Sequence, residues 1–427
     1  IPQLYTEEPA QSGPRRVVVK RAGEVGVVQV AYKVPQALHA DHPALEILAA
    51  ILSEGKTSRL YRALIDTNLA ISANASKGFF HDPTLFNATA MLAPGSTHDQ
   101  VEKTLLAEIE KVKKDGVTPA EVSRAINKLL AGIAYQRDGS FAIAGQINEA
   151  IAVGDWTYYT GQLEKLKTVT AADVQRVAKA YCNEDQSTTG WFIPQAEAPA
   201  KSAGILPAHE GSEAGKMPAL LPGYARGPHY YRDPSDSDSL RSRAGLPGIR
   251  SPLREQRDGQ GISPGSAGDS ALVAPRVRRR TVSGLDTLTL KTSIKDVVTI
   301  RGVLNAGDVF NPAGNSAIAD LTAGMIDKGT AKRDKFAVAE VLEQTGATLH
   351  FGTGSHTLNF SAKCLRQDLP TVLGLLAEQL RTPRFDPAEF AKLKQQMIGR
   401  HKRQMEDTDS RADSAFRRTR PKKRKSS

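Results

Sequence analysis

The strongest hydrophobic pattern of the chain lies in residues 315–330, where apolar and polar positions recur with the period of a helix. The apolar side chains fall three and four residues apart and would therefore share one helical face. They are Ile318, Leu321, Met325 and Ile326. Gly329 follows at the position where a left-handed residue commonly ends a helix. The pattern predicts an amphipathic helix that is closed by a glycine.

The same pattern occurs a second time, in residues 44–57, when Gly55 is aligned with Gly329. Further stretches downstream repeat in the same order. The matching pairs are Ile51-Leu52 with Met325-Ile326, residues 105–108 with 375–378, and residues 118–121 with 386–389. We interpret the chain as two units of one fold in tandem, the second stopping before its own last helices and strand.

The remaining apolar patterns divide into strand-like and helix-like runs. In the first unit we expect strands near 17–19, 25–32, 69–75, 84–92 and 188–193, and helices over 42–54, 58–66, 99–114, 118–153, 158–166 and 171–181. In the second unit we expect strands over 287–292, 297–304, 348–352 and 357–363, and helices over 315–330, 336–344, 368–380 and 387–405. Both orders predict the α+β class, each lobe being an antiparallel-rich sheet covered by helices.

Between the two units, residues 195–281 keep neither period for more than about ten residues. They are rich in Gly, Pro, Ser and charged side chains, which predicts a disordered linker or an insertion. We therefore expect domains at 1–194 and 282–416, and a basic tail at 417–427. Because the regular pattern stops abruptly at both places, we also hypothesise that 196–281 and 417–427 arose from a frameshift or an insertion.

The chain has a formal net charge of +11, which by itself suggests a nucleic-acid partner. Two runs without an acid account for all of it: four arginines within 276–280 and seven basic residues within 417–425. The rest is formally neutral, so the lobes present no net basic field. We expect both runs to be solvated chain, with attachment to nucleic acid or a membrane surface as the alternative.

The cysteines and the chain termini give little further information about the fold or the function. Cys182 and Cys364 lie one in each unit, without the spacing of a disulfide framework or a cysteine zinc site. No run of about 18 apolar residues occurs, so we expect no membrane-spanning segment. The amino terminus has neither Met nor a basic and apolar leader, and we expect the chain to begin inside a longer precursor. The redox compartment stays open.

Four short motifs carry a family resemblance. They are residues 5–9 leading to 15–17, residues 58–62, residues 325–330 and residues 346–349. Together they resemble the insulinase/pitrilysin family of zinc metallopeptidases, the inverzincins, over about 1–194 and 281–416 of this chain. A tandem member of that family has four α+β lobes. The resemblance implies that 1–194 is a second, non-zinc lobe and that 282–416 is a truncated third lobe.

In this family the helix predicted over 315–330 corresponds to the one that carries the zinc motif HxxEH, whose two His bind the metal and whose Glu activates the bound water. The ligand positions here hold Asp320 and Gly324, the base position holds Ala323, and the third ligand position holds His401. Asp320 and His401 fall short of the three protein ligands that a catalytic zinc takes. The resemblance thus implies no catalytic residue and no metal site in this chain. Zinc would belong to the family's catalytic lobe, and no other HxxEH or HExxH motif occurs.

The family also holds its substrate with an Arg and a Tyr that come from another lobe. The corresponding positions in residues 1–194 hold Ile65 and Ile71. Arg59 and Tyr61 precede them and do not replace them. We expect Arg59 and Tyr61 to make packing contacts of a helix, and the family's pair to belong to a fourth lobe.

One binding feature of the family is expected to persist. Active members add the substrate peptide as an extra strand to a sheet edge, and residues 350–354 are similar in place to that edge. Phe351, Gly352 and Thr353 are therefore the candidate peptide-binding residues. An uncovered edge without a ligand is the alternative.

These observations predict a fragment of an insulinase/pitrilysin-type metallopeptidase that encloses peptide or unfolded protein substrate without cutting it. A zinc-bearing lobe or a sibling subunit would be its partner. The alternative is a non-catalytic structural or partner subunit, like the core proteins of respiratory complexes, and a basic-tailed binder of nucleic acid is a third hypothesis. The resemblance favours a bacterial periplasm or cytoplasm without choosing between them. Substrate identity and oligomeric state stay open.

Overall fold

The computed structural model describes residues 11–136, 140–195, 276–282, 284–292, 296–312, 315 and 317–404. The chain divides into two compact units, one made of residues 1–199 and 294–427 and the other of residues 200–293. The larger unit contains most of both lobes expected from the sequence. Within the described residues, no helix is long and apolar enough to cross a membrane.

A five-stranded sheet forms the first lobe, with the strand order β1-β5-β2-β4-β3. Its strands are β1 (Arg15–Ala22), β2 (Val27–Val34), β3 (Ala70–Lys77), β4 (Thr84–Leu92) and β5 (Ser187–Gln195). Strand β1 runs parallel to β5, and every other pair is antiparallel; Val30 of β2 lies opposite Ala88 of β4 and Thr189 of β5. The two ends of the lobe's sequence therefore lie side by side in one sheet.

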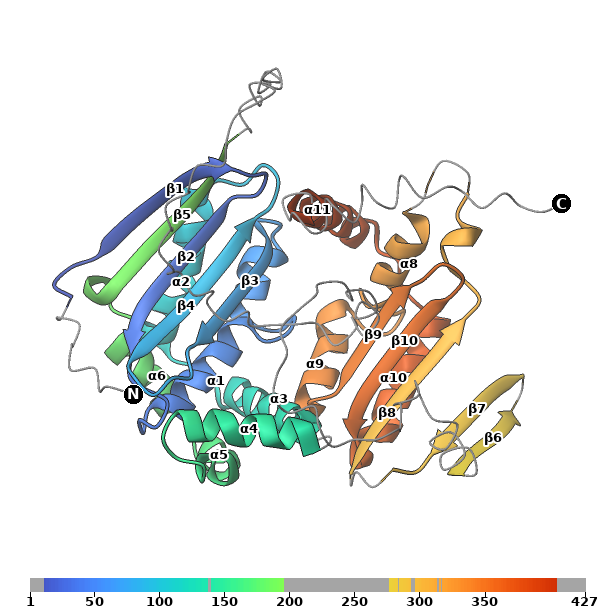
Figure 1. Cartoon of the computed structure of the whole chain (residues 1–427). Helices are drawn as coiled ribbons and strands as arrows, with labels where there is room; N and C mark the ends of the chain where they lie inside the picture. Colours follow the sequence, from blue (N-terminus) through green and yellow to red (C-terminus); the bar gives the residue numbers. More distant parts are fainter. Residues whose placement is uncertain are drawn as a thin grey trace, which may run out of the picture. The chain divides into compact units, whose positions relative to one another are not determined.

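Helices cover one face of this sheet. The helices that contact the strands are α1 (His42–Ser53), η1 (Tyr61–Ile65), α2 (His98–Asp115) and α6 (Ala171–Tyr181). Helices α3 (Pro119–Gln136), α4 (Ser140–Ala152) and α5 (Tyr158–Lys167) pack on other helices, and the short η2 (Glu184–Gln186) precedes β5. Figure 1 shows α1, α2 and α6 against the same face. Strand β4 explains the side they take, because Phe86, Ala88, Ala90 and Leu92 are buried at every second position while Leu85 is exposed.

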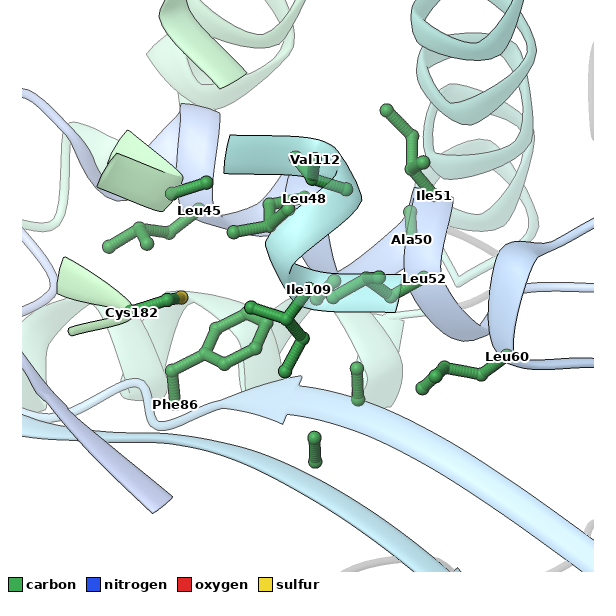
Figure 2. Close-up of a cluster of buried hydrophobic side chains, with 14 of the residues drawn as sticks. Leu45, Leu48, Ala50, Ile51, Leu52, Leu60, Phe86, Ile109, Val112 and Cys182 are labelled. Carbon is green, nitrogen blue, oxygen red and sulfur yellow. The ribbon is translucent and has the colours of Figure 1, made fainter. Parts of the chain in front are cut away.

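The core of the first lobe lies between this sheet face and the helices. Phe86 of β4 is fully buried and points toward Ile109 of α2 (Figure 2). Leu45, Leu48 and Leu52 of α1 belong to the same cluster. Since full burial of one such side chain stabilises the fold by roughly 1.5–3 kcal/mol, the cluster supplies a core without any disulfide.

A capping box begins helix α3. The N–H of Thr118 donates to Glu121 Oε2 at 2.8 Å, and the N–H of Glu121 donates to Thr118 Oγ1 at 3.2 Å. The helix that follows is shorter than predicted, because the run expected to reach residue 153 is divided into α3, which ends at Gln136, and α4, which begins at Ser140. Residues 137–139 lie outside the described part of the chain.

A three-stranded sheet with the order β8-β10-β9 forms the other lobe of the larger unit. Its elements are β8 (Val297–Leu304), η4 (Asp308–Phe310), α8 (Ile318–Ile326), α9 (Lys335–Thr345), β9 (Thr348–Thr353), β10 (Leu358–Leu365), η5 (Arg366–Asp368), α10 (Leu369–Arg381) and α11 (Pro387–Gln404). Val372 and Leu376 of α10 pack with Leu349, Ala362 and Cys364 of the sheet, and Figure 1 shows α10 on that face. The predicted α+β class is confirmed in both lobes.

The described part of the smaller unit is a hairpin of β6 (Val277–Val282) and β7 (Leu285–Leu290). Here one expectation is corrected, because the arginine run within 276–280 is not free chain throughout: Arg280 lies opposite Thr287 in the ladder, and Arg279 pairs with Asp286 at 2.6 Å. Residues 196–275 and 417–427 lie outside the described residues, so the expectations about their disorder and origin stay predictions.

Candidate functional site

The candidate site is built on α8, the helix that the hydrophobic pattern singled out. Met325 and Ile326 are buried, as that pattern predicts, whereas Ile318 of the same predicted face is exposed. The helix runs from Ile318 to Ile326, shorter at both ends than the predicted 315–330. Gly329 has a φ of +125°, and a Cβ there would lie 3.0 Å from the carbonyl oxygen of Arg333. The glycine is therefore required by the sharp turn that leads out of the helix.

Asp320 and Ala323, which the sequence predicts to occupy the first-ligand and base positions of the family motif, are both engaged in structural contacts. Asp320 is exposed at the start of α8, and its Oδ1 accepts a hydrogen bond from the hydroxyl of Thr353 at the end of β9. Ala323 is 3% exposed and clusters with Ile326 and Leu358, with Phe351 packed against them. The helix surface that would face a metal in the family here faces apolar side chains and one hydroxyl.

Gly324 and His401, at the other two predicted ligand positions, have different surroundings. A Cβ on Gly324 would lie 3.0 Å from Leu393 Cδ2, so the missing side chain lets α8 and α11 pack closely. His401 is exposed on the last turn of α11. In the part of the chain that the structure describes, no group of three His, Cys, Asp or Glu is placed to hold a metal ion. The residues present do not fit a catalytic zinc.

Strand β9 carries the three candidate peptide-binding residues and is the last strand of its sheet among the described residues. The N–H of Gly354 donates across the turn to the carbonyl of Thr357 at 2.8 Å, toward β10. Because successive residues of a strand alternate in direction, Gly352 also faces β10, where Asn359 lies opposite it. Phe351 and Thr353 therefore direct their main-chain groups to the open side of the sheet.

The positions of the family's Arg and Tyr serve packing in this chain. Ile65 ends η1, and Ile71 of β3 approaches α11 so closely that a Cβ on Gly399 would lie 2.6 Å from Ile71 Cγ2. Arg59 donates to Glu121 at 2.8 Å and to the carbonyl of Gly116 at 3.0 Å. Arg59 thereby joins the segment before η1 to the start of α3, as a helix-packing residue is expected to do.

Tyr61, the neighbour of Arg59 in the expected helix, lies in η1. Burial raises the pKa of its phenol, and the carboxylates of Asp327 and Asp66 raise it further. The hydroxyl is thus held in its neutral form at all ordinary pH values. Nothing in this environment favours an ionised tyrosine.

A buried cluster around His42, at the start of α1, was not predicted from the sequence. His42 is 1% exposed, and its Nε2 lies 2.7 Å from Lys77 Nζ, which in turn lies 3.7 Å from Glu46 Oε2. Its Nδ1 lies 3.4 Å from the hydroxyl of Tyr158, and its ring lies 5.5 Å from that of Phe79. Burial and, to a smaller extent, the nearby Lys77 lower the pKa of His42 to about 3, so the imidazole is neutral at ordinary pH.

Comparison with known proteins agrees with the geometry. A family model described as the peptidase M16 inactive domain matches residues 1–129, and a model described as insulinase (peptidase family M16) matches residues 287–424. Together these ranges span more than half of the chain. The chain belongs to the insulinase family of peptidases.

Particular relatives show how much of the family's length is present. The zinc protease PqqE of Helicobacter pylori is 31% identical over 196 residues, which are 45% of this chain and 44% of that protein. The inactive peptidase domain of a proposed zinc protease from Bordetella parapertussis is 32% identical, with a TM-score of 0.39 over 42% of this chain and 97% of that one. The ferredoxin protease FusC, solved with Arabidopsis ferredoxin, is 16% identical, with a TM-score of 0.45 over 97% of this chain and 46% of that one. The chain therefore spans less than half the length of the Helicobacter relative.

Restoring a histidine at position 324 should destabilise the lobe. In Gly324→His the new side chain begins 3.0 Å from Leu393 Cδ2, so Leu393 must move to make room, and we expect a loss of about 1–3 kcal/mol in the free energy of unfolding. Urea unfolding followed by circular dichroism measures it. The control Asp320→His changes an exposed residue of the same helix and should cost less. Equal losses for the two variants would contradict the packing role of Gly324.

The burial of neutral His42 should make stability depend on pH. Its pKa is about 3 in the folded chain and about 6.5 when unfolded, so the unfolded chain binds more protons below pH 6.5. The contribution is complete above that pH and is lost as the pH falls toward 3. At pH 5 it should lower the free energy of unfolding by about 2 kcal/mol relative to pH 8.

Urea unfolding at the two pH values, on the unaltered chain and on His42→Gln, isolates this contribution. Glutamine keeps a hydrogen-bonding side chain but does not titrate. We expect the drop between pH 8 and pH 5 to shrink by the amount assigned to His42. A variant whose stability falls as steeply as that of the unaltered chain would show that other groups carry the pH dependence.

Proposed function

We propose that this chain supplies non-catalytic lobes of an insulinase-family peptidase that receive an extended peptide at the edge strand β9. One observation carries the proposal: the helix that bears the catalytic motif in the family is present as α8, and Asp320, Ala323 and Gly324 are committed there to structural contacts. A lobe that keeps the family's fold but lacks its metal ligands and its catalytic base is suited to hold a substrate without cutting it. The zinc and its ligands would come from a lobe outside this chain.

The geometry of β9 supports binding of a peptide backbone. Phe351 and Thr353 direct main-chain donors and acceptors to the open side of the sheet, at the two positions that an incoming strand would pair with. Recognition through main-chain groups is independent of the peptide's sequence. Gly352, the third predicted residue, faces β10 and would contribute space rather than a hydrogen bond. The proposed ligand class is therefore unfolded polypeptide.

The sheet of the first lobe offers a second surface for the same ligand class. Its face opposite the helices is hollowed by a cavity of about 520 Å³. Both polar and apolar side chains line it, among them Gln29, Lys33, Leu85, Thr188 and Trp191. Such a mixed surface suits an unfolded chain, because it offers hydrogen-bonding groups and apolar contact without demanding a particular side chain. We propose that it forms part of the wall around the substrate.

The purified chain should hydrolyse no unfolded casein when zinc is added, because the ligand positions of α8 bind no catalytic metal. A fluorescence assay with labelled casein, with and without a chelator, measures this. Cleavage that depends on zinc and is abolished by the chelator would overturn the non-catalytic assignment.

Binding of the same casein should depend on the main-chain N–H of Thr353. Thr353→Pro removes that donor at an edge position where proline is tolerated, and we expect the affinity to fall about tenfold. Thr353→Ala is the matched control, since it also loses the hydroxyl contact with Asp320 but keeps the N–H. Fluorescence anisotropy measures both. Equal affinities of the two variants, or no casein binding by the unaltered chain, would favour a purely structural role.

A further inference from the structure

The open edge of β9 lies beside the carboxylate of Asp320. Helix α8 packs against β9, as Figure 1 shows, and Asp320 is exposed in the first turn of that helix. Its Oδ1 accepts a hydrogen bond from the hydroxyl of Thr353, the last residue of the strand. Among the residues that the structure describes, this hydroxyl is the only partner of the carboxylate, and no Lys, Arg or His pairs with it. The second carboxylate oxygen is therefore available to a ligand at the edge.

The side chains of β9 alternate between the two faces of the sheet, and every second one points to the side on which α8 lies. Leu349 is buried in the core of the lobe, and Phe351 packs against Ala323 of α8. Thr353, two positions further on, reaches Asp320 of the same helix. A peptide added at the edge would present every second side chain to this face as well.

The peptide position opposite Thr353 comes close to Asp320. When a strand pairs antiparallel with β9, the residue directly opposite Thr353 shares its face of the sheet, with the two Cβ atoms about 4.5–5.5 Å apart. The threonine hydroxyl is itself hydrogen-bonded to the carboxylate. A lysine or arginine at the opposing position is long enough to span the remaining distance. A glutamate there would place two carboxylates side by side, and like charges so placed destabilise the pairing.

Phe351 defines a second position of the same peptide. Its ring packs against apolar residues of α8 and of the sheet but stays only partly buried. The peptide residue two positions from the basic one would lie opposite Phe351 and cover more of the ring. An apolar side chain is favoured there because it removes apolar surface of both partners from water. The edge thus favours a basic and an apolar residue two positions apart.

We propose that Asp320 selects the peptide at β9 for a lysine or arginine opposite Thr353. This inference rests on the proposed binding of unfolded polypeptide at that edge and adds a charge preference to it. The main-chain groups of β9 hold any extended segment, and the complementary charge of Asp320 favours a basic one. The residue that the sequence predicts at a zinc-ligand position of the family would then serve recognition in this chain.

Peptides that differ in one residue test the preference on the full chain. Short fluorescent peptides of alternating threonine and valine carry lysine, glutamine or glutamate in place of the central valine, and fluorescence anisotropy gives the dissociation constant of each. We expect the lysine peptide to bind about threefold to tenfold more tightly than the glutamate peptide, with glutamine between them. An exposed opposite-charge pair contributes modestly, and a like-charge pair costs a similar amount. Raised salt should reduce the difference.

Variants of Asp320 locate the preference. Asp320→Asn removes the charge and keeps an acceptor for the Thr353 hydroxyl, so the lysine and glutamate peptides should bind within about twofold of each other. Asp320→Lys should reverse their order. Glu340→Gln is the matched control, because it removes a carboxylate of the same lobe that lies on α9, is 51% exposed and faces Arg124 at 3.7 Å. In this control the preference for lysine should be unchanged.

The outcomes separate this inference from the proposed function. Equal affinities for the three peptides, or a preference for lysine that persists in Asp320→Asn, would overturn the role of Asp320 and leave peptide binding intact. No binding of any peptide would overturn the proposed function and this inference with it. Circular dichroism shows whether each variant keeps its helix content, and Asp320→Asn decides alone should Asp320→Lys lose it.

Discussion

The carboxylate of Glu343 lies between two lobes, and a buried charge is stable only where donors surround it. Those donors belong to Lys56 and Thr57, 287 and 286 positions away in the sequence. They converge because Gly55 takes a positive φ and leaves room for the carboxylate. This contact acts together with the pairing of Lys335 with Asp66 and the hydrogen bond from Asn127 to Gln344 to place α9 against the first lobe.

Helix α8 shows how a lobe of this family keeps its shape where the metal motif is lost. The helix needs an apolar face and neighbours to pack against, which Met325, Ile326 and the strands of its sheet provide. A catalytic zinc needs three correctly placed side chains, and these are additional to the fold. Here Ala323 clusters with Phe351 packed against it, and the absence of a side chain on Gly324 leaves room for Leu393.

Several features could be read from local sequence. The glycine after α8 follows from residue spacing, and the structure shows its positive φ. The edge position of residues 350–354 was implied by the family resemblance, and β9 is the last strand of its sheet among the described residues. Local patterns predicted the lengths of helices and strands less reliably, because the end of an element depends on tertiary contacts that the local sequence does not show. The run predicted to 153 is two helices, and the arginines within 276–280 lie largely in β6, where they take part in the pairing with β7.

The sequence by itself determined the α+β class, the tandem repeat and the absence of an HxxEH motif, because residue spacing within one helix or strand is a local property. Only the tertiary structure decided what the replaced residues do and how the lobes are joined. Asp320 meets Thr353, and Glu343 meets Thr57, through folding that brings distant segments together. Burial then decides whether a charged side chain is solvated surface or part of the contact between two lobes, and burial is a property of the assembled lobes.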